Sequence, residues 1–183
     1  MIKINLIIHK LSSLWKSILL VLILIFFGFE MYTMFIQNYE GNIDLPQLTG
    51  NFTQVREMLA KEQQKDEFCF AIIGDTQSHG TFEQIARELR SESLSFAVFL
   101  GDFVRKGTEG NHNYFKSEYA TEFTFPFPAF FVVGNHDVDM DSFPLSRFEE
   151  VYGPSIFSFE YQKCLFVVLR TLNEPYSNEE SLQ

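Results

Sequence analysis

Apolar residues fall into short blocks beyond residue 50, and the spacing within each block predicts an element of secondary structure. Phe52, Val55 and Leu59 recur at helical spacing, so residues 52–64 are expected to form an amphipathic helix. Three later blocks are continuously apolar, which is typical of strands buried on both faces: residues 68–73, 96–100 and 129–133. Further helices are expected over about 82–91, 113–122 and 145–151, and two strands follow with the sequences IFSFEY and CLFVVL.

The order strand, helix, strand, helix, strand predicts an α/β fold with a largely parallel sheet. In such sheets the side chains that bind ligands gather just beyond the carboxyl ends of the strands. Candidate functional residues are therefore expected where each of the three apolar strands ends.

An apolar stretch near the N-terminus, ILLVLILIFFGFEMYTMFI at residues 18–36, just reaches the roughly 20 residues that a helix needs to cross a bilayer. We expect a transmembrane anchor over residues 17–36, preceded by a cytoplasmic segment at 1–16. A linker and short helix at 37–66 then lead to the body at 67–183. A cleaved signal peptide is the main alternative, although no small-residue cleavage site follows the stretch. A buried core helix is the third interpretation.

The charges that flank this stretch predict its orientation. Lys3, Lys10 and Lys16 precede it, and Glu40 and Asp44 follow it. The positive-inside rule then places the N-terminus in the cytoplasm and the body on the extracytoplasmic side. Beyond Lys16 the chain has 11 basic against 24 acidic residues. A body this acidic is not expected to bind a nucleic-acid backbone, since that affinity comes mostly from Lys and Arg on phosphates.

A glycine followed by a polar residue of ligand type closes each of the three apolar strands. The strands end AIIGDTQSHG, VFLGDFVRKG and FVVGNHDVD, which places Asp75, Asp102 and Asn135 at one edge of the predicted sheet. Glycine allows a sharp turn and a close approach at such a point. Oxygen ligands beside an imidazole suit a divalent metal such as Mn, Fe or Zn. Two such ions can clamp the attacking and leaving oxygens of a phosphoryl transfer.

These motifs, GD-x-x, GD-x-V-x-x-G and GNHD in this order, resemble those of the calcineurin-like metallophosphoesterases. The sequence FEEVYGPSIFSFEY followed by CLFVVL also looks like the stretch that follows GNHD in that family. The resemblance covers about residues 67–172. It implies part of a four-layer α/β/β/α sandwich, a site for two divalent metal ions (Mn, Fe or Zn) and a phosphate-ester substrate, either a phosphomonoester or a phosphodiester.

The resemblance also implies a role for each motif residue. Asp75 would bind the first metal ion, Asp102 would bridge the two, and Asn135 would bind the second. His136 would stand over the leaving group as a general acid or charge stabiliser. Asp137 would orient the imidazole of His136 from behind.

The first motif departs from the family pattern at Gln77, where the family usually has a histidine that binds the first metal. A glutamine oxygen can still bind a metal, though more weakly. His79 lies two residues further along and is an alternative ligand, but a solvated loop histidine is the favoured interpretation.

A second departure concerns the family's remaining histidine ligands, which lie well downstream and include a GHxH motif. No histidine follows His136 in this sequence. We therefore expect the sequence to hold the N-terminal portion of the domain, with little or no activity on its own. The alternatives are a catalytically inactive remnant or a membrane-bound binding module of the same fold, and a protein in which the glycine-aspartate corners are only turns.

Two kinds of residue outside the motifs receive a simpler interpretation. His112, in EGNHNYF, is expected to be a loop histidine with no task, although contact with a substrate phosphate is the alternative. Cys69 and Cys164 lie in apolar blocks and are expected to be small buried residues, with a single disulfide between them as the alternative.

Overall fold

The computed structural model describes residues 2–41, 43–46, 49–50, 52–61, 67–77 and 80–172. The chain forms two compact units, over residues 1–38 and 39–183. His79 and the residues from 173 to 183 lie outside the described residues.

The first unit is a single helix, α1 (Ile2–Gln37), which begins well before the span predicted at 17–36. Within it, Leu14–Gln37 has a mean hydropathy of 2.3 over its most apolar window, and none of that window is buried. This helix is long and apolar enough to cross a membrane, although a signal sequence near an N-terminus would have the same properties. A core helix can be equally long and apolar, so all three interpretations of this segment stay predictions.

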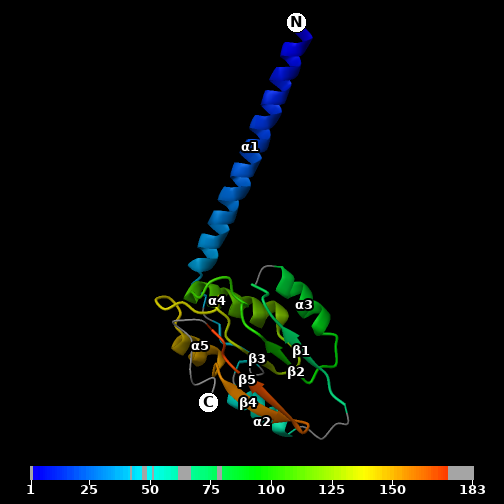
Figure 1. Cartoon of the computed structure of the whole chain (residues 1–183), viewed down its shortest axis with the longest axis vertical. Helices are drawn as coiled ribbons and strands as arrows, with labels where there is room; N and C mark the ends of the chain where they lie inside the picture. Colours follow the sequence, from blue (N-terminus) through cyan, green and yellow to red (C-terminus); the bar gives the residue numbers. More distant parts are fainter. Residues whose placement is uncertain are drawn as a thin grey trace. The chain divides into compact units, whose positions relative to one another are not determined.

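The second unit is built on three parallel strands, as the apolar blocks predicted. Strands β1 (Phe70–Ile73), β2 (Phe96–Phe99) and β3 (Ala129–Phe131) form one sheet in the order β1-β2-β3. The register pairs Ile73 with Phe99 and Phe99 with Phe131, so the three strands end level with one another. The mixed α/β character of the body is confirmed, and Figure 1 shows the helices and strands of this unit.

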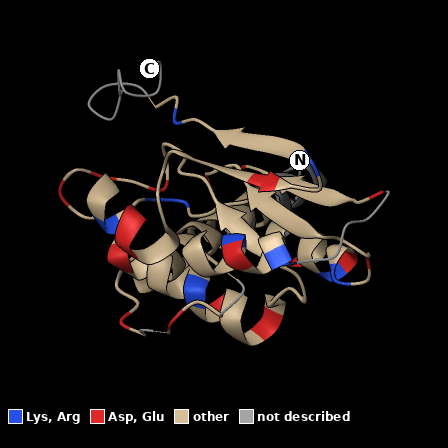
Figure 2. Cartoon of the chain, turned by 90° about the horizontal axis from the view of Figure 1, so that it is seen from below, with Lys and Arg blue, Asp and Glu red and all other residues tan. Residues whose placement is uncertain are grey.

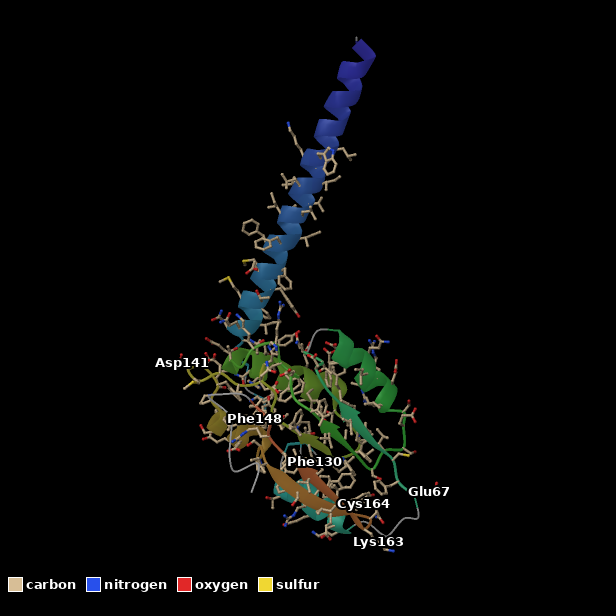
Figure 3. All side chains as sticks on the ribbon, viewed as in Figure 1. Glu67, Phe130, Asp141, Phe148, Lys163 and Cys164 are labelled. Carbon is tan, nitrogen blue, oxygen red and sulfur yellow. The ribbon has the colours of Figure 1, made fainter. Side chains whose placement is uncertain are left out.

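Each face of the sheet is covered by a different layer (Figure 1). Phe99 and Phe131 stack on one face, in the core shared with helices α3 (Thr81–Leu89), α4 (Glu109–Glu118) and α5 (Leu145–Tyr152). Phe96 and Phe130 point to the other face, where the antiparallel hairpin of β4 (Phe157–Tyr161) and β5 (Cys164–Val168) packs together with α2 (Phe52–Lys61). Phe130 on the hairpin side and Phe148 on α5 mark the two layers in Figure 3.

Charged residues are confined almost entirely to helices and loops (Figure 2). Glu160 is the one charged residue within the five strands that the structure describes. The three parallel strands can therefore lie between the two layers without leaving ionised side chains in the interior.

Two expectations of complete burial are wrong. Strand β1 is exposed on one side, where Phe70 and Ile72 are 38% and 60% exposed, because β1 is an edge strand that the hairpin covers only in part. Cys69 and Cys164 are both free and exposed. Cys69 directly precedes β1, and Cys164 begins β5, directly after Lys163 at the turn between β4 and β5 (Figure 3).

Helix α4 begins at Glu109, four residues before the predicted start at residue 113. Thr108 supplies the N-cap, since its Oγ1 accepts a hydrogen bond from the Asn111 amide at 3.3 Å. The helix continues into a π-helical turn, η1 (Tyr119–Phe123). The sequence after Gly107 is therefore helix where a polar loop was expected, and His112 lies in its buried part.

Candidate functional site

The first two glycine-aspartate motifs are joined by backbone hydrogen bonds at one edge of the sheet. The Leu100 amide donates to the Ile73 carbonyl at 2.7 Å, continuing the β1–β2 pairing past its last residue. Beyond it, the Asp75 amide donates to Gly101 O at 3.2 Å, and the Gln77 amide donates to Asp102 O at 2.9 Å. The loop that carries Asp75 and Gln77 is therefore fixed to the loop that carries Asp102.

The second and third motifs meet even more closely. A Cβ on Gly101 or on Gly134 would stand less than 3.0 Å from the backbone of the other loop, so neither position has room for a side chain. The His136 amide donates to Asp102 Oδ1 at 2.9 Å. This bond turns the Asp102 carboxylate toward the loop that carries Asn135 and His136.

Three residues of these loops adopt the left-handed conformation: Asp75 has a φ of 53°, Gln77 of 47° and Asp102 of 54°. This region costs a non-glycine residue about 1–2 kcal/mol, although aspartate tolerates it better than most. Such backbone strain gathers at functional sites, where the surrounding structure holds it in place. The two aspartates that sequence reasoning selected are thus among the strained residues.

Asp137 is completely buried and accepts four backbone hydrogen bonds. Oδ2 accepts from the amides of Asp102 at 2.7 Å and Gly134 at 2.8 Å. Oδ1 accepts from Phe103 at 3.1 Å and Val104 at 3.2 Å. Burial raises the pKa of Asp137 to about 7, and these amide donors act in the opposite direction. Its carboxylate therefore ties the second motif to the third.

His136 is oriented by a different group from the one expected. Its Nδ1 lies 3.1 Å from the carbonyl oxygen of Arg105, which can only accept, so Nδ1 carries the hydrogen. The Nε2 atom of this exposed imidazole is left as the nitrogen that can meet a ligand. The resemblance implied that Asp137 orients this ring, whereas in the structure the Asp137 carboxylate contacts backbone amides and Arg105 orients the ring.

The donor set at this edge fits part of a metal site. Asp75, Asp102 and Asn135 supply oxygen atoms of the kind that divalent ions prefer. Gln77 Nε2 donates to Asp75 Oδ1 at 3.0 Å, which orients the Asp75 carboxylate. Thr76 Oγ1 is buried and has no hydrogen-bond partner within the described residues. Among those residues there is, however, no group of three or more His, Cys, Asp or Glu side chains that could hold an ion.

His112 is the residue of this region that sequence reasoning misjudged. It is 0% exposed, so it is neither a loop histidine nor a contact for substrate phosphate. Its ring stacks on Phe143 with centroids 3.7 Å apart. The spacing of His112, Phe115 and Tyr119 at i, i+3 and i+7 was the available signal, because all three lie on the buried face of one helical segment.

Comparison with known proteins gives a family. The family model described as "Calcineurin-like phosphoesterase" matches residues 69–177, which is more than half of the chain. This range contains all three strand-end motifs. No curated protein matches the chain, and no solved structure does so either.

Proposed function

Because the chain belongs to the calcineurin-like phosphoesterase family, we propose that it is a metal-dependent phosphoesterase held at a membrane by α1. The observation that carries the proposal is that the three motifs meet at one edge of the sheet. The His136 amide donates a hydrogen bond to Asp102 Oδ1, and the Gln77 amide donates one to Asp102 O. The substrate is a phosphate ester, either a monoester or a diester.

In this proposal the residues of the sheet edge would hold two divalent ions of Mn, Fe or Zn. Asp75 and Gln77 would bind one ion, Asn135 would bind the other, and Asp102 would serve both. When bound, the ions would supply Lewis-acid stabilisation of the charge on the phosphoryl group. The family generally uses divalent metals, and the oxygen-rich donor set supports that use here.

His136 acts on the leaving group. Its Nδ1–H donates to Arg105 O, which leaves Nε2 as the nitrogen that can meet the substrate. When Nε2 is protonated as well, the imidazolium can give its Nε2 proton to the departing oxygen and return to the neutral ring with Nδ1–H. Asp137 is a positioning residue, because its carboxylate accepts hydrogen bonds from the amides of Asp102 and Gly134 and holds them in place. It is completely buried, so it would not contact the substrate itself. The chain's own residues thus orient the substrate-facing groups and hold the proton donor.

We further assign residues 67–183 to the N-terminal portion of a four-layer α/β/β/α domain. The support is an exposed apolar surface on the hairpin and the edge strand, where Ile72, Leu165 and Val167 are each more than half exposed. Large apolar side chains exposed on a strand are typical of a face that another layer covers.

The membrane part of the proposal places residues 1–16 in the cytoplasm, residues 17–36 in the bilayer, and 37–66 as the linker and short helix outside. The three lysines before the apolar stretch support this orientation. The chain should resist extraction from membranes by alkaline carbonate, and protease added outside should digest the body. Release by carbonate, or protection of the body, would contradict the anchor or its orientation.

The activity is tested by measuring hydrolysis of bis(p-nitrophenyl) phosphate and p-nitrophenyl phosphate by the full chain with Mn²⁺. Asp102→Ala should abolish any Mn²⁺-dependent turnover, whereas Asp141→Ala, in the exposed loop after the GNHD motif, should not change it. Measurable Mn²⁺-dependent turnover that is equal in wild type and Asp102→Ala would overturn the assignment.

A second candidate, a membrane-bound binding module without catalysis, is favoured by one observation. The described residues contain no cluster of three metal-binding acidic, histidine or cysteine side chains. Tight binding of a phosphate ester without hydrolysis, in protein loaded with Mn²⁺, would support this candidate over the enzyme.

A further inference from the structure

His112 connects helix α4 to the loop of the GNHD motif by a buried hydrogen bond. Its Nε2 lies 2.8 Å from the backbone oxygen of Asp137, and its Nδ1 lies 2.9 Å from the Tyr152 hydroxyl. His112 and Asp137 are completely buried and Tyr152 is almost so. The ring therefore links α4, α5 and the motif loop away from solvent.

The chemistry of the partners determines which ring nitrogen carries the hydrogen. A backbone carbonyl can only accept, so Nε2–H donates to Asp137 O, and Nδ1 accepts from the Tyr152 hydroxyl. Burial lowers the pKa of His112 to about 3, which keeps the ring neutral with one donor and one acceptor. The ring face is fixed by stacking on Phe143.

Asp137 is held at both ends by these contacts. Its carboxylate accepts the amides of Asp102 and Gly134, and its carbonyl accepts from His112. The backbone near it is crowded as well, because a Cβ on Gly107 would meet the Val138 backbone at less than 3.0 Å. A shift of the Asp137 carbonyl would consequently move the carboxylate and the two amides that it orients.

We propose that His112 is a positioning residue for the sheet-edge site, which it holds in its metal-binding arrangement through the backbone of Asp137. This inference rests on the proposed function, because it concerns the residues assigned to the metal ions. It extends that function to a residue on a separate helix, one that touches neither metal nor substrate. Loss of a hydrogen bond that orients such groups typically weakens metal binding about 10–100-fold.

The test uses the full chain in detergent micelles and measures Mn²⁺ affinity by calorimetry. His112→Leu removes both ring nitrogens at similar volume, and His112→Gln restores an N–H donor near the position of Nε2. We expect at least a tenfold loss of affinity in His112→Leu and recovery to within about threefold in His112→Gln. Wild-type affinity in His112→Leu would overturn the proposal, as would equal losses in the two variants.

A matched control separates positioning from general loss of stability. Phe123→Leu truncates a buried residue of η1, which packs against Phe82 and has no bond to the motif loop. It should lower the melting temperature without changing Mn²⁺ affinity. If it weakens Mn²⁺ binding as much as His112→Leu at equal stability, the effect of His112 is not specific and the proposal is wrong.

A second readout remains decisive even if wild-type protein binds no Mn²⁺, a result that would defeat the proposed function itself. Nitrogen-15 spectra should show His112 protonated at Nε2 and not at Nδ1 between pH 8 and pH 5. In His112→Leu the amide proton signals of Asp102 and Gly134 should shift, whereas in Phe123→Leu they should stay. Unmoved signals in a folded His112→Leu variant would overturn the positioning role. If His112→Leu fails to fold, unmoved signals in Tyr152→Phe, which loses the hydrogen bond to His112 Nδ1, would overturn it.

Discussion

Gly134 lies so close to the carboxylate of Asp102 that a Cβ at position 134 would stand less than 3.0 Å from Asp102 Oδ1. The same oxygen accepts the His136 amide at 2.9 Å. The glycine of the GNHD motif, Gly134, therefore packs directly against the side chain of Asp102. Asp102 is the residue that would serve both metal ions in the proposed site. A glycine at this position is required by the close approach of the two loops.

Gly134→Ala should therefore displace the Asp102 carboxylate. We expect Mn²⁺ affinity to fall at least tenfold and the free energy of unfolding to fall by about 1–3 kcal/mol, as for other overpacked sites. Gly74→Ala is the matched control, because a Cβ there would meet Leu100 at 3.6 Å, an ordinary contact. Calorimetry and urea unfolding measure both effects, and equal Mn²⁺ affinities in the two variants would refute the argument.

Asp137→Asn should destabilise the protein, because the carboxylate of Asp137 accepts hydrogen bonds from buried backbone amides. The variant keeps the shape of the side chain, but its NH₂ group faces amide donors that need an acceptor. A loss of about 3 kcal/mol in the free energy of unfolding is expected, since the donors are buried. Asp141→Asn, at an exposed loop position, should change it by less than about 0.5 kcal/mol. If Asp137→Asn also lowers the free energy of unfolding by less than about 0.5 kcal/mol, the hydrogen bonds to the Asp137 carboxylate contribute little to stability.

His112 predicts a specific dependence of stability on pH. Its pKa is lowered by burial to about 3 in the folded protein, against about 6.5 in the unfolded chain. Between these values the unfolded chain binds more protons, so the stability contributed by His112 is lost as the pH falls below about 6.5. Wild type should lose up to about 1.4 kcal/mol per pH unit relative to His112→Gln.

The comparison with His112→Gln cancels the groups that titrate in both proteins, including Asp137. Urea unfolding at pH 7, 6, 5 and 4 gives the difference directly. A difference that does not change over this range would mean that His112 is not buried in its neutral form.

Glu118 should affect stability in the opposite pH direction. Burial raises the pKa of Glu118 to about 7, and the nearby carboxylates of Glu83 and Glu122 act in the same direction. The hydrogen bond from the Tyr114 hydroxyl acts in the opposite direction and lowers the pKa. The folded protein then binds more protons than the unfolded chain between about pH 4.5 and 7, so stability falls as the pH rises through that range.

Glu118→Gln should be more stable than wild type at pH 8 and nearly equal to it at pH 5. Because Glu118 is only half buried, solvent screening limits the gain at pH 8 to about 1 kcal/mol. Glu92→Gln, at an exposed position after α3, is the control and should show no such trend. A gain that is the same at pH 5 and pH 8 would contradict the raised pKa.

The apolar blocks predicted the parallel sheet and the place of the candidate site because both depend on local pattern. Each of the three strands ends in a glycine and a polar residue that can be recognised without knowledge of the tertiary structure. The level ends of β1, β2 and β3 then bring Asp75 and Asp102 into neighbouring loops.

The features that the sequence did not reveal depend on contacts between distant residues. His112 and Asp137 are 25 positions apart, and the bond between them exists only because α4 packs beside the motif loop. Because Thr108 caps α4, the helix begins earlier than predicted, within a stretch whose Gly and Asn residues are typical of a loop. The exposure of Ile72 likewise follows from the position of β1 at the edge of the sheet, which an apolar run cannot indicate.

The most direct test of the central claim is calorimetric titration of Mn²⁺ into the full chain and into its Asp102→Asn variant, with Asp141→Asn as the control. The proposed site predicts that wild type and Asp141→Asn bind Mn²⁺ alike and that Asp102→Asn binds at least tenfold more weakly. Wild-type affinity in Asp102→Asn, or no Mn²⁺ binding by the wild-type chain, would contradict the assignment of the sheet edge as a metal site.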